Sequence, residues 1–91
     1  MSKIHVKEKH KLGLETALQD AEKLAQMLSD RFDAKYHWQQ NTLIFHRTGV
    51  KGRLDVTEDT LEVTVELSLL MRPFKSRVER EIKDYFAKEL R

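Results

Sequence analysis

The sequence contains no cysteine and only one proline and three glycines among its 91 residues. Without cysteine the chain has no disulfide framework and no thiolate ligand for a metal. This composition suits a reducing compartment, and we expect a cytoplasmic location. The length fits one domain, and no linker or repeat divides it. We therefore predict a single domain over residues 1–91.

Long apolar runs are also missing. No segment approaches the roughly 18 consecutive apolar residues that a membrane span requires. The N-terminal stretch MSKIHVKEKHK is charged and lacks the apolar core of a signal peptide. We therefore expect neither a membrane span nor a secretion signal. At 40% hydrophobic residues the chain is nevertheless predicted to be globular.

The motifs that usually carry catalysis or metal binding are absent too. The sequence has no GxSxG, P-loop or GxGxxG motif. Its histidines follow neither the HExxH pattern nor zinc-finger spacing, and the simplest interpretation is that they lie on the surfaces of strands. They are His5, His10, His37 and His46. We expect no enzymatic activity, no cofactor and no metal site.

Two segments have the spacing of amphipathic helices. In residues 14–32 the apolar side chains fall within an arc of about 120°, the width of a core-facing stripe. A second helix is predicted to begin at Pro73, since proline is favoured at the first helical position. Its apolar stripe is Phe74, Val78, Ile82, Tyr85, Phe86 and Leu90. Its charges are spaced for i,i+4 pairs: Arg77 with Glu81, Glu79 with Lys83, Arg80 with Asp84, and Asp84 with Lys88.

Alternating residues predict five strands, the first over residues 4–9 and the others between the helices. Two-residue turns at Gln40-Asn41, Thr48-Gly49 and Glu58-Asp59 set the register of a four-stranded meander. In the first turn, Asn41 is the residue that tolerates positive φ. This register puts the large apolar residues, except Ile44, on one face, and it sets Phe45 opposite Gly52. A slip of one residue would invert a whole strand, so the agreement supports the register.

We therefore predict an α+β fold with the order β-α-β-β-β-β-α. The curved, five-stranded antiparallel sheet has strand order 1-5-4-3-2 and carries both helices on one face. The other face is predicted to be solvated and to carry Lys35, His37, His46, Lys51 and Arg53. Nucleic-acid binding is not expected, because the aromatic residues needed to stack bases point to the helix side.

Two candidate sites remain. The first is the corner between the last strand and the last helix, where Leu69 is predicted to point inward and Leu70 outward. Leu70 and Met71, beside Arg72 and Lys75, either contact a partner or an anionic surface, or they pack under the helix. The second is an apolar cleft between the sheet and the last helix, unless the same residues simply form core. It would be lined by Tyr36, Trp38, Phe45, Phe74 and Tyr85.

Several short motifs carry a family resemblance when taken in order. They are HKLGL at residues 10–14, YHW at 36–38, TLIF at 42–45, GVKGRL at 49–54 and LLMRPFK at 69–75. Their order and spacing resemble the polyhydroxyalkanoic acid system proteins, a small bacterial family named for gene regions connected with polymer granules. The resemblance implies a small cytoplasmic protein and supplies no catalytic residues. At fold level alone, the chain resembles a shortened helix-grip fold, as in START-type lipid carriers.

These observations lead to two functional hypotheses. The first is a non-enzymatic accessory protein that binds polyhydroxyalkanoate granules or granule proteins. The alternative is a small carrier of an acyl or other hydrophobic ligand, held between the sheet and the C-terminal helix. A homodimer is also compatible with the sequence, because the strand over residues 34–39 is expected to be a free sheet edge.

Overall fold

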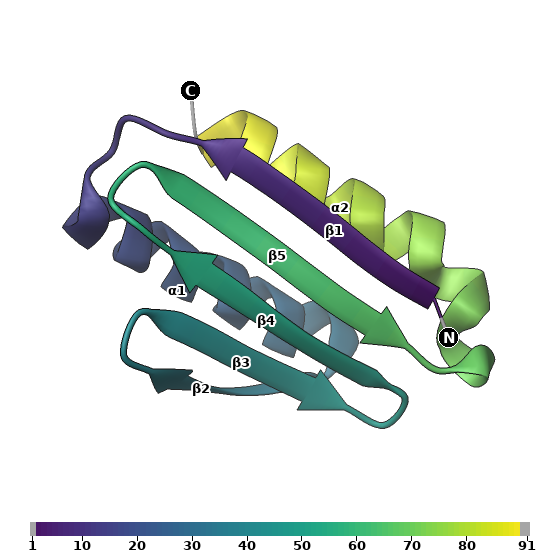
Figure 1. The fold of residues 1–91 in the computed structure, drawn as a ribbon. Helices are drawn as coiled ribbons and strands as arrows, with labels where there is room; N and C mark the ends of the chain where they lie inside the picture. The colour runs from purple at the N-terminus through teal and green to yellow at the C-terminus, as the bar shows by residue number, and fades with distance from the viewer. Residues whose placement is uncertain (1, 90–91) are drawn as a thin grey trace.

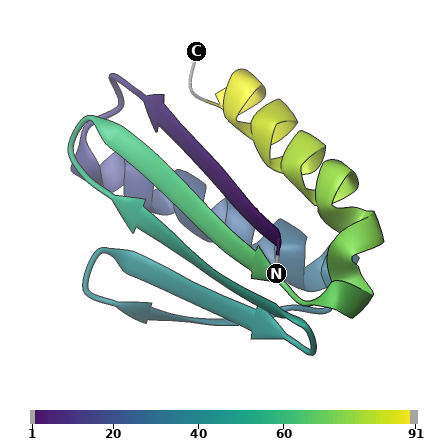
Figure 2. The ribbon, with the colours of Figure 1, turned by 45° about the vertical axis from the view of Figure 1, so that its right-hand side comes forward.

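A computed structural model describes residues 2–89 of the chain. Its elements are β1 (Ser2–Lys9), α1 (Leu14–Phe32), β2 (Lys35–Gln39), β3 (Thr42–Arg47), β4 (Val50–Val56), β5 (Thr60–Leu67), the 3-10 helix η1 (Leu69–Phe74) and α2 (Lys75–Glu89). The strands form one open antiparallel sheet in the order β1-β5-β4-β3-β2 (Figure 1). Both helices lie against the same face of the sheet (Figure 2). The predicted fold class and strand order are confirmed.

The strand register also agrees with the prediction. Trp38 pairs with Leu43, and Val56 pairs with Leu61. The first turn differs in one detail, because the positive φ of 55° belongs to Gln40, whereas Asn41 was expected to adopt it. Gln40 directly follows β2, and the two-residue loop needs its left-handed step at that first position. The register survives because it depends on loop length and on the apolar alternation.

The core lies between the inner face of the sheet and the two helices. The largest fully buried side chains come from four of the strands and from both helices: Ile4, Leu24, Leu43, Leu54, Leu61, Val63, Val65, Leu67 and Ile82. Helix α1 supplies a stripe of small residues as well, with Ala17, Ala21 and Ala25 all buried. Because these side chains are short, α1 can approach the sheet closely.

Helix α1 ends at Phe32, and the backbone of Asp33 caps it. Asp33 adopts the left-handed conformation with φ 57°, and its N–H donates to the carbonyl of Ser29. A left-handed residue after the last turn satisfies helix carbonyls that would otherwise lack a partner. The reversal sends the chain back into β2, so the predicted end of the helix near residues 32–33 is confirmed.

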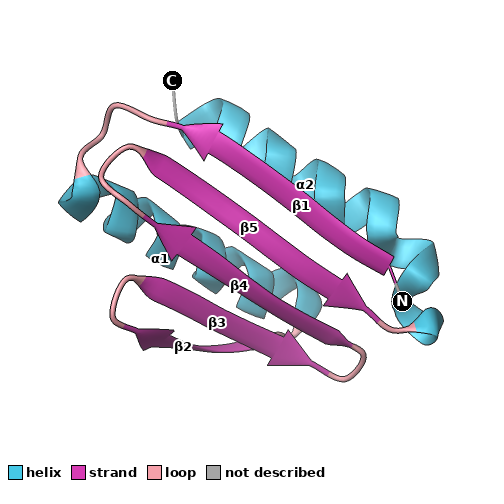
Figure 3. Ribbon diagram, in the orientation of Figure 1, coloured by secondary structure: helices cyan, strands magenta, loops and turns pink. Residues whose placement is uncertain are grey.

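The corner after β5 departs from the prediction. The strand ends at Leu67, where the Ser68 N–H donates to the carbonyl of Gly49. The Met71 N–H then donates to the carbonyl of Ser68, which begins the 3-10 helix. Pro73 therefore lies inside η1, and α2 begins at Lys75. Figure 3 shows the short helical segment that joins β5 to α2. Because Pro73 has no N–H to donate to a preceding carbonyl, a regular α-helix cannot run through this position, and α2 begins after it.

The i,i+4 ion pairs predicted for α2 are only partly formed. Glu79 pairs with Lys83 at 3.8 Å, as expected. Glu81 was expected to pair with Arg77, but its carboxylate lies 2.9 Å from Arg31 of α1. This ion pair links the two helices, a contact that the spacing along one helix does not reveal. Leu90, the last member of the predicted apolar stripe, lies outside the described residues.

Candidate functional site

The corner at η1 exposes large apolar side chains. Leu69 is 70% exposed, Leu70 is 87% exposed and Phe74 is 45% exposed. Leu69 was predicted to point inward, and that prediction is wrong because β5 ends two residues before it. Leu14, at the start of α1, is the other large apolar residue exposed within residues 2–89, at 36%. Apolar exposure in the described chain is thus concentrated at η1.

Leu70 and Met71 were predicted to be either both buried by this chain or both available to a partner, but their burial differs in the structure. Leu70 faces solvent, whereas Met71 is half-buried and packs against the core. The Met71 side chain lies so close to Gly49 that a Cβ built there would be 2.7 Å from its Cγ. Arg72 is exposed and Lys75 is half-buried. The candidate surface therefore consists of Leu69, Leu70, Arg72, Phe74 and Lys75, which we term the η1 corner.

A cavity of about 260 Å³ lies beside the η1 corner, between the C-terminal end of α1, the sheet and the start of α2. The sheet contributes Phe45, Val50 and Val65, while Leu28, Phe32 and Ala34 come from α1 and the segment after it. The opposite wall is Met71, Phe74, Val78 and Ile82. An apolar cleft between the sheet and the last helix was predicted, and the structure contains one.

Three arginines also line this cavity: Arg31, Arg47 and Arg77. They meet around Phe32. Arg47 donates a 2.6 Å hydrogen bond to the Phe32 carbonyl, and the Arg77 guanidinium lies 5.9 Å from the centre of the Phe32 ring. Arg31 is the preceding residue and pairs with Glu81. The cavity therefore combines an apolar lining with a cationic group of side chains.

The aromatic residues predicted for the cleft are divided among three places. Phe45 and Phe74 line the cavity, as expected. Tyr85 lies between the helices, where its hydroxyl donates to the carbonyl of Asp20. Tyr36 and Trp38 lie under α1, away from the cavity, so the prediction that they line it is wrong. Their position follows from the strand order, which puts β2 at the far edge of the sheet from β1 (Figure 1).

Tyr36 and Trp38 share one partner, Glu22 of α1. The Tyr36 hydroxyl donates to one carboxylate oxygen at 2.6 Å, and the Trp38 Nε1–H donates to the other at 2.8 Å. These bonds lower the pKa of Glu22, the bond from Tyr36 contributing most. The same carboxylate raises the pKa of the Tyr36 phenol. Sequence reasoning missed this cluster, because Glu22 lies in α1 and its two partners lie in β2, and no local spacing relates the two elements.

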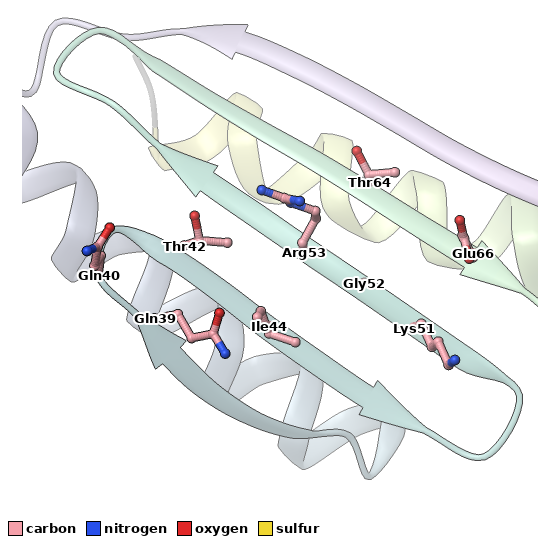
Figure 4. A pocket seen from close by; sticks show the side chains of 9 residues that line it. All are labelled: Gln39, Gln40, Thr42, Ile44, Lys51, Gly52, Arg53, Thr64 and Glu66. Carbon is pink, nitrogen blue, oxygen red and sulfur yellow. The ribbon is translucent and has the colours of Figure 1, made fainter.

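The outer face of the sheet has a shallow hollow of about 580 Å³ over β3, β4 and β5 (Figure 4). Its side chains are mainly polar, and Ile44, Lys51 and Arg53 stand on it (Figure 4). Arg53 forms a 2.8 Å ion pair with Asp55, which lowers the pKa of that carboxyl. The prediction of a solvated face free of helices is confirmed.

His10 is a further correction. It was predicted to lie on a strand surface, but it is buried in the connection after β1. Its Nε2 is 3.1 Å from the Thr57 carbonyl, and its Nδ1 accepts a 3.1 Å bond from the Leu12 N–H. Both ring nitrogens therefore hold loops together. Among the residues that the structure describes, no group of three His, Asp or Glu side chains is placed to hold a metal ion.

Comparison with known proteins gives one match. The chain matches the family model described as "Putative polyhydroxyalkanoic acid system protein" over residues 4–90. Searches of curated proteins and of solved structures found no significant match, so the likeness to helix-grip carriers stays a prediction. No helix within residues 2–89 has both the length and the apolar character needed to cross a membrane. The family match covers nearly the whole chain, and the protein therefore belongs to the polyhydroxyalkanoic acid system protein family.

Proposed function

We propose that this protein is a non-enzymatic accessory component of the polyhydroxyalkanoic acid system. It acts by associating with polymer granules, or with proteins on them, through the η1 corner. Family membership supports the polymer context. The observation that carries the proposal is the concentration of Leu69, Leu70 and Phe74, all exposed, within one six-residue 3-10 helix.

Physical chemistry favours a partner for this corner. Exposed apolar surface costs about 25 cal/mol for each Å² that a partner could remove from water. Three neighbouring large side chains rimmed by polar residues are typical of an interaction surface. Arg72 and Lys75 flank them with positive charge, which suits the anionic groups found at many amphipathic interfaces. The corner is therefore suited to an apolar surface bordered by negative charge.

Two observations support a non-enzymatic role. The two carboxyls with shifted pKa values, Glu22 and Asp55, have pKa values lowered by hydrogen bonds from neighbouring side chains. A general acid at neutral pH needs the opposite shift. The hydrogen bonds of His10, which hold two loops, give that side chain a structural role as well. A cytoplasmic, granule-associated location follows from the proposal.

Carriage of a small hydrophobic ligand is a second candidate function. It is favoured by the apolar cavity beside α2 and not by the η1 corner. The two functions use different surfaces, apart from Phe74, which contributes to both.

The granule proposal is tested by fusing the chain to a fluorophore in a polymer-accumulating cell and measuring the fraction retained on purified granules. The double substitution Leu69→Ser, Leu70→Ser is expected to lower that fraction at least tenfold, since a factor of ten corresponds to about 1.4 kcal/mol. Each leucine side chain contributes roughly 1.5–3 kcal/mol when fully buried. Because both are exposed in the free protein, thermal stability should change by less than about 0.5 kcal/mol.

Leu14→Ser is the matched control, because Leu14 is also an exposed leucine. It is the first residue of α1, which begins at the other end of the sheet from η1 (Figure 1). Granule retention of this variant should equal that of the unaltered chain. Diffuse fluorescence of the unaltered fusion, with no enrichment on purified granules, would contradict the proposal. Equal losses in the η1 variant and in the control would also contradict it.

A further inference from the structure

The cavity beside α2 has features of a small-molecule site. Its lining is mainly apolar, and its volume of about 260 Å³ equals that of eight or nine water molecules at about 30 Å³ each. Pockets of this kind usually join apolar walls to a few polar groups that orient the ligand. Here the polar groups are guanidiniums, so the ligand should carry a negative charge at one end.

The charges around the cavity are not balanced. Arg31 is neutralised by Glu81 at 2.9 Å. Arg47 donates to a backbone carbonyl, and Arg77 lies over an aromatic ring. Neither of these two arginines forms an ion pair with a carboxylate among the side chains that the structure describes, those of residues 2–88. Both side chains contact Phe32, so two positive charges adjoin one residue of the cavity wall.

We propose that this cavity binds a free medium-chain alkanoate. The hydrocarbon chain lies against Val65, Val78 and Ile82, and the carboxylate is bound by Arg47 and Arg77. Guanidinium groups recognise carboxylates with paired, charge-assisted hydrogen bonds. Hydroxyalkanoic acids, the units of the polymer for which the family is named, belong to this chemical class. The proposal rests on the carrier candidate and gives it a ligand class and two binding residues.

Other occupants fit less well. A polymer strand is far larger than 260 Å³ and has no free carboxylate along its length. The exposed Leu70 of a second copy could fill the apolar part. However, a leucine side chain is neutral, and it would bury the arginines without a partner. Charge complementarity therefore favours the free acid.

Titration of the isotopically labelled full chain with butyrate, hexanoate, octanoate and decanoate tests the proposal by NMR. Each added methylene should tighten the dissociation constant about fourfold until the cavity is full. The affinity should then level off near octanoate. Backbone amide signals of Ala34, Val65 and Val78 should shift most, because these residues line the cavity. Neutral 1-octanol should bind at least about tenfold more weakly than octanoate, because it lacks the charge that the arginines recognise.

Arg77→Met is the test variant, and Arg80→Met is its matched control on the same helix. Arg80 is exposed and does not line the cavity. Arg77→Met should weaken octanoate binding about tenfold and leave octanol binding unchanged, while Arg80→Met should bind both like the unaltered chain. Sedimentation of the protein should show the same oligomeric state with and without octanoate.

Several results would overturn the proposal. The first is an affinity that does not depend on the length of the alkanoate. The second is equal binding of octanol and octanoate, and the third is an equal effect of the two arginine variants on octanoate binding. A dimer that dissociates when octanoate is added would assign the cavity to a second copy instead. The Arg77→Met variant should be retained on granules like the unaltered chain, because Leu69 and Leu70 are intact in it. Its granule retention therefore distinguishes a failure of this inference from a failure of the granule proposal.

Discussion

Glu22 is the residue through which α1 holds the outermost strand. Its carboxylate accepts hydrogen bonds from Tyr36 and Trp38 of β2 and from Gln26 of its own helix. Strand β2 pairs with a neighbour on one side only, so these side-chain bonds supplement its backbone pairing. A carboxylate that accepts several bonds stabilises the folded state only while it is ionised.

The pH dependence of stability follows from this arrangement. The pKa of Glu22 in the folded protein is below its ordinary value of 4.5. Its contribution is therefore present above about pH 4.5, and it is lost as the pH falls through the lowered folded value. Glu22→Gln should reduce the free energy of unfolding at pH 7 by about 1 kcal/mol, because a partly buried donor loses its acceptor. The same variant should show a shallower decline of stability between pH 5 and pH 3 in urea unfolding monitored by circular dichroism.

Glu15→Gln provides the comparison, because Glu15 is an exposed acid in the first turn of the same helix. The fall in its free energy of unfolding between pH 5 and pH 3 should match that of the unaltered chain. Asp55, whose pKa is also lowered, should contribute to the slope that remains in Glu22→Gln. An unchanged slope in Glu22→Gln would show that the hydrogen bonds to Tyr36 and Trp38 do not contribute to stability.

At the scale of the element, β4 depends on one glycine. Gly52 pairs with Phe45 of β3, and the phenyl ring lies across the position that a Cβ would occupy. The ring is consequently buried, at 5% exposure, and it forms part of the cavity floor. The sequence predicted this arrangement from the register alone, and the structure confirms it.

Gly52→Ala should therefore destabilise the protein by about 1–3 kcal/mol, because the new methyl group overlaps the Phe45 ring in a packed core. Chemical unfolding measures the loss. In a Phe45→Leu background the same alanine should cost less, since the smaller side chain leaves room. Equal costs in both backgrounds would show that the ring is not the cause.

At the scale of the whole molecule, the sheet has two unequal edges. Strand β5 lies between β1 and β4, with residue pairs on both sides. Strand β2 pairs only with β3, over five residues, whereas the other edge strand, β1, pairs over eight. An edge with unpaired backbone groups can pair with a second chain. This feature is compatible with the predicted homodimer, which stays a prediction.

Amide hydrogen exchange should reflect this asymmetry. We expect the slowest exchange in β5 and β4, intermediate rates in β1 and the fastest strand amides in β2, as measured by NMR in deuterated buffer. Local opening is cheapest where the fewest neighbouring bonds must break. Protection of β2 equal to that of β5 would contradict this order. It would also indicate that a partner chain covers the β2 edge.

The local pattern of the sequence is sufficient for the framework of this fold. Alternation and turn length predict the register of β2 to β5, and 3.6-residue spacing predicts α1, because both depend on neighbours along the chain. The Gln40 turn illustrates the limit. Its length was predicted, but the residue with positive φ was not, because the twist of the two strands selects the turn type.

The sequence predicted a corner and a cleft, but the tertiary structure alone decided which residues form them. Alternation predicted Leu69 on the inner face, but the 3-10 helix that begins with the bond from the Met71 N–H to the Ser68 carbonyl starts directly after β5 and leaves Leu69 exposed. Arg31, Arg47 and Arg77 come from three elements and meet only because α1, β3 and α2 converge at Phe32. Glu22 likewise meets Tyr36 and Trp38 across the layers. Periodicity identifies which face of an element is buried, but the angles between elements decide which distant residues meet.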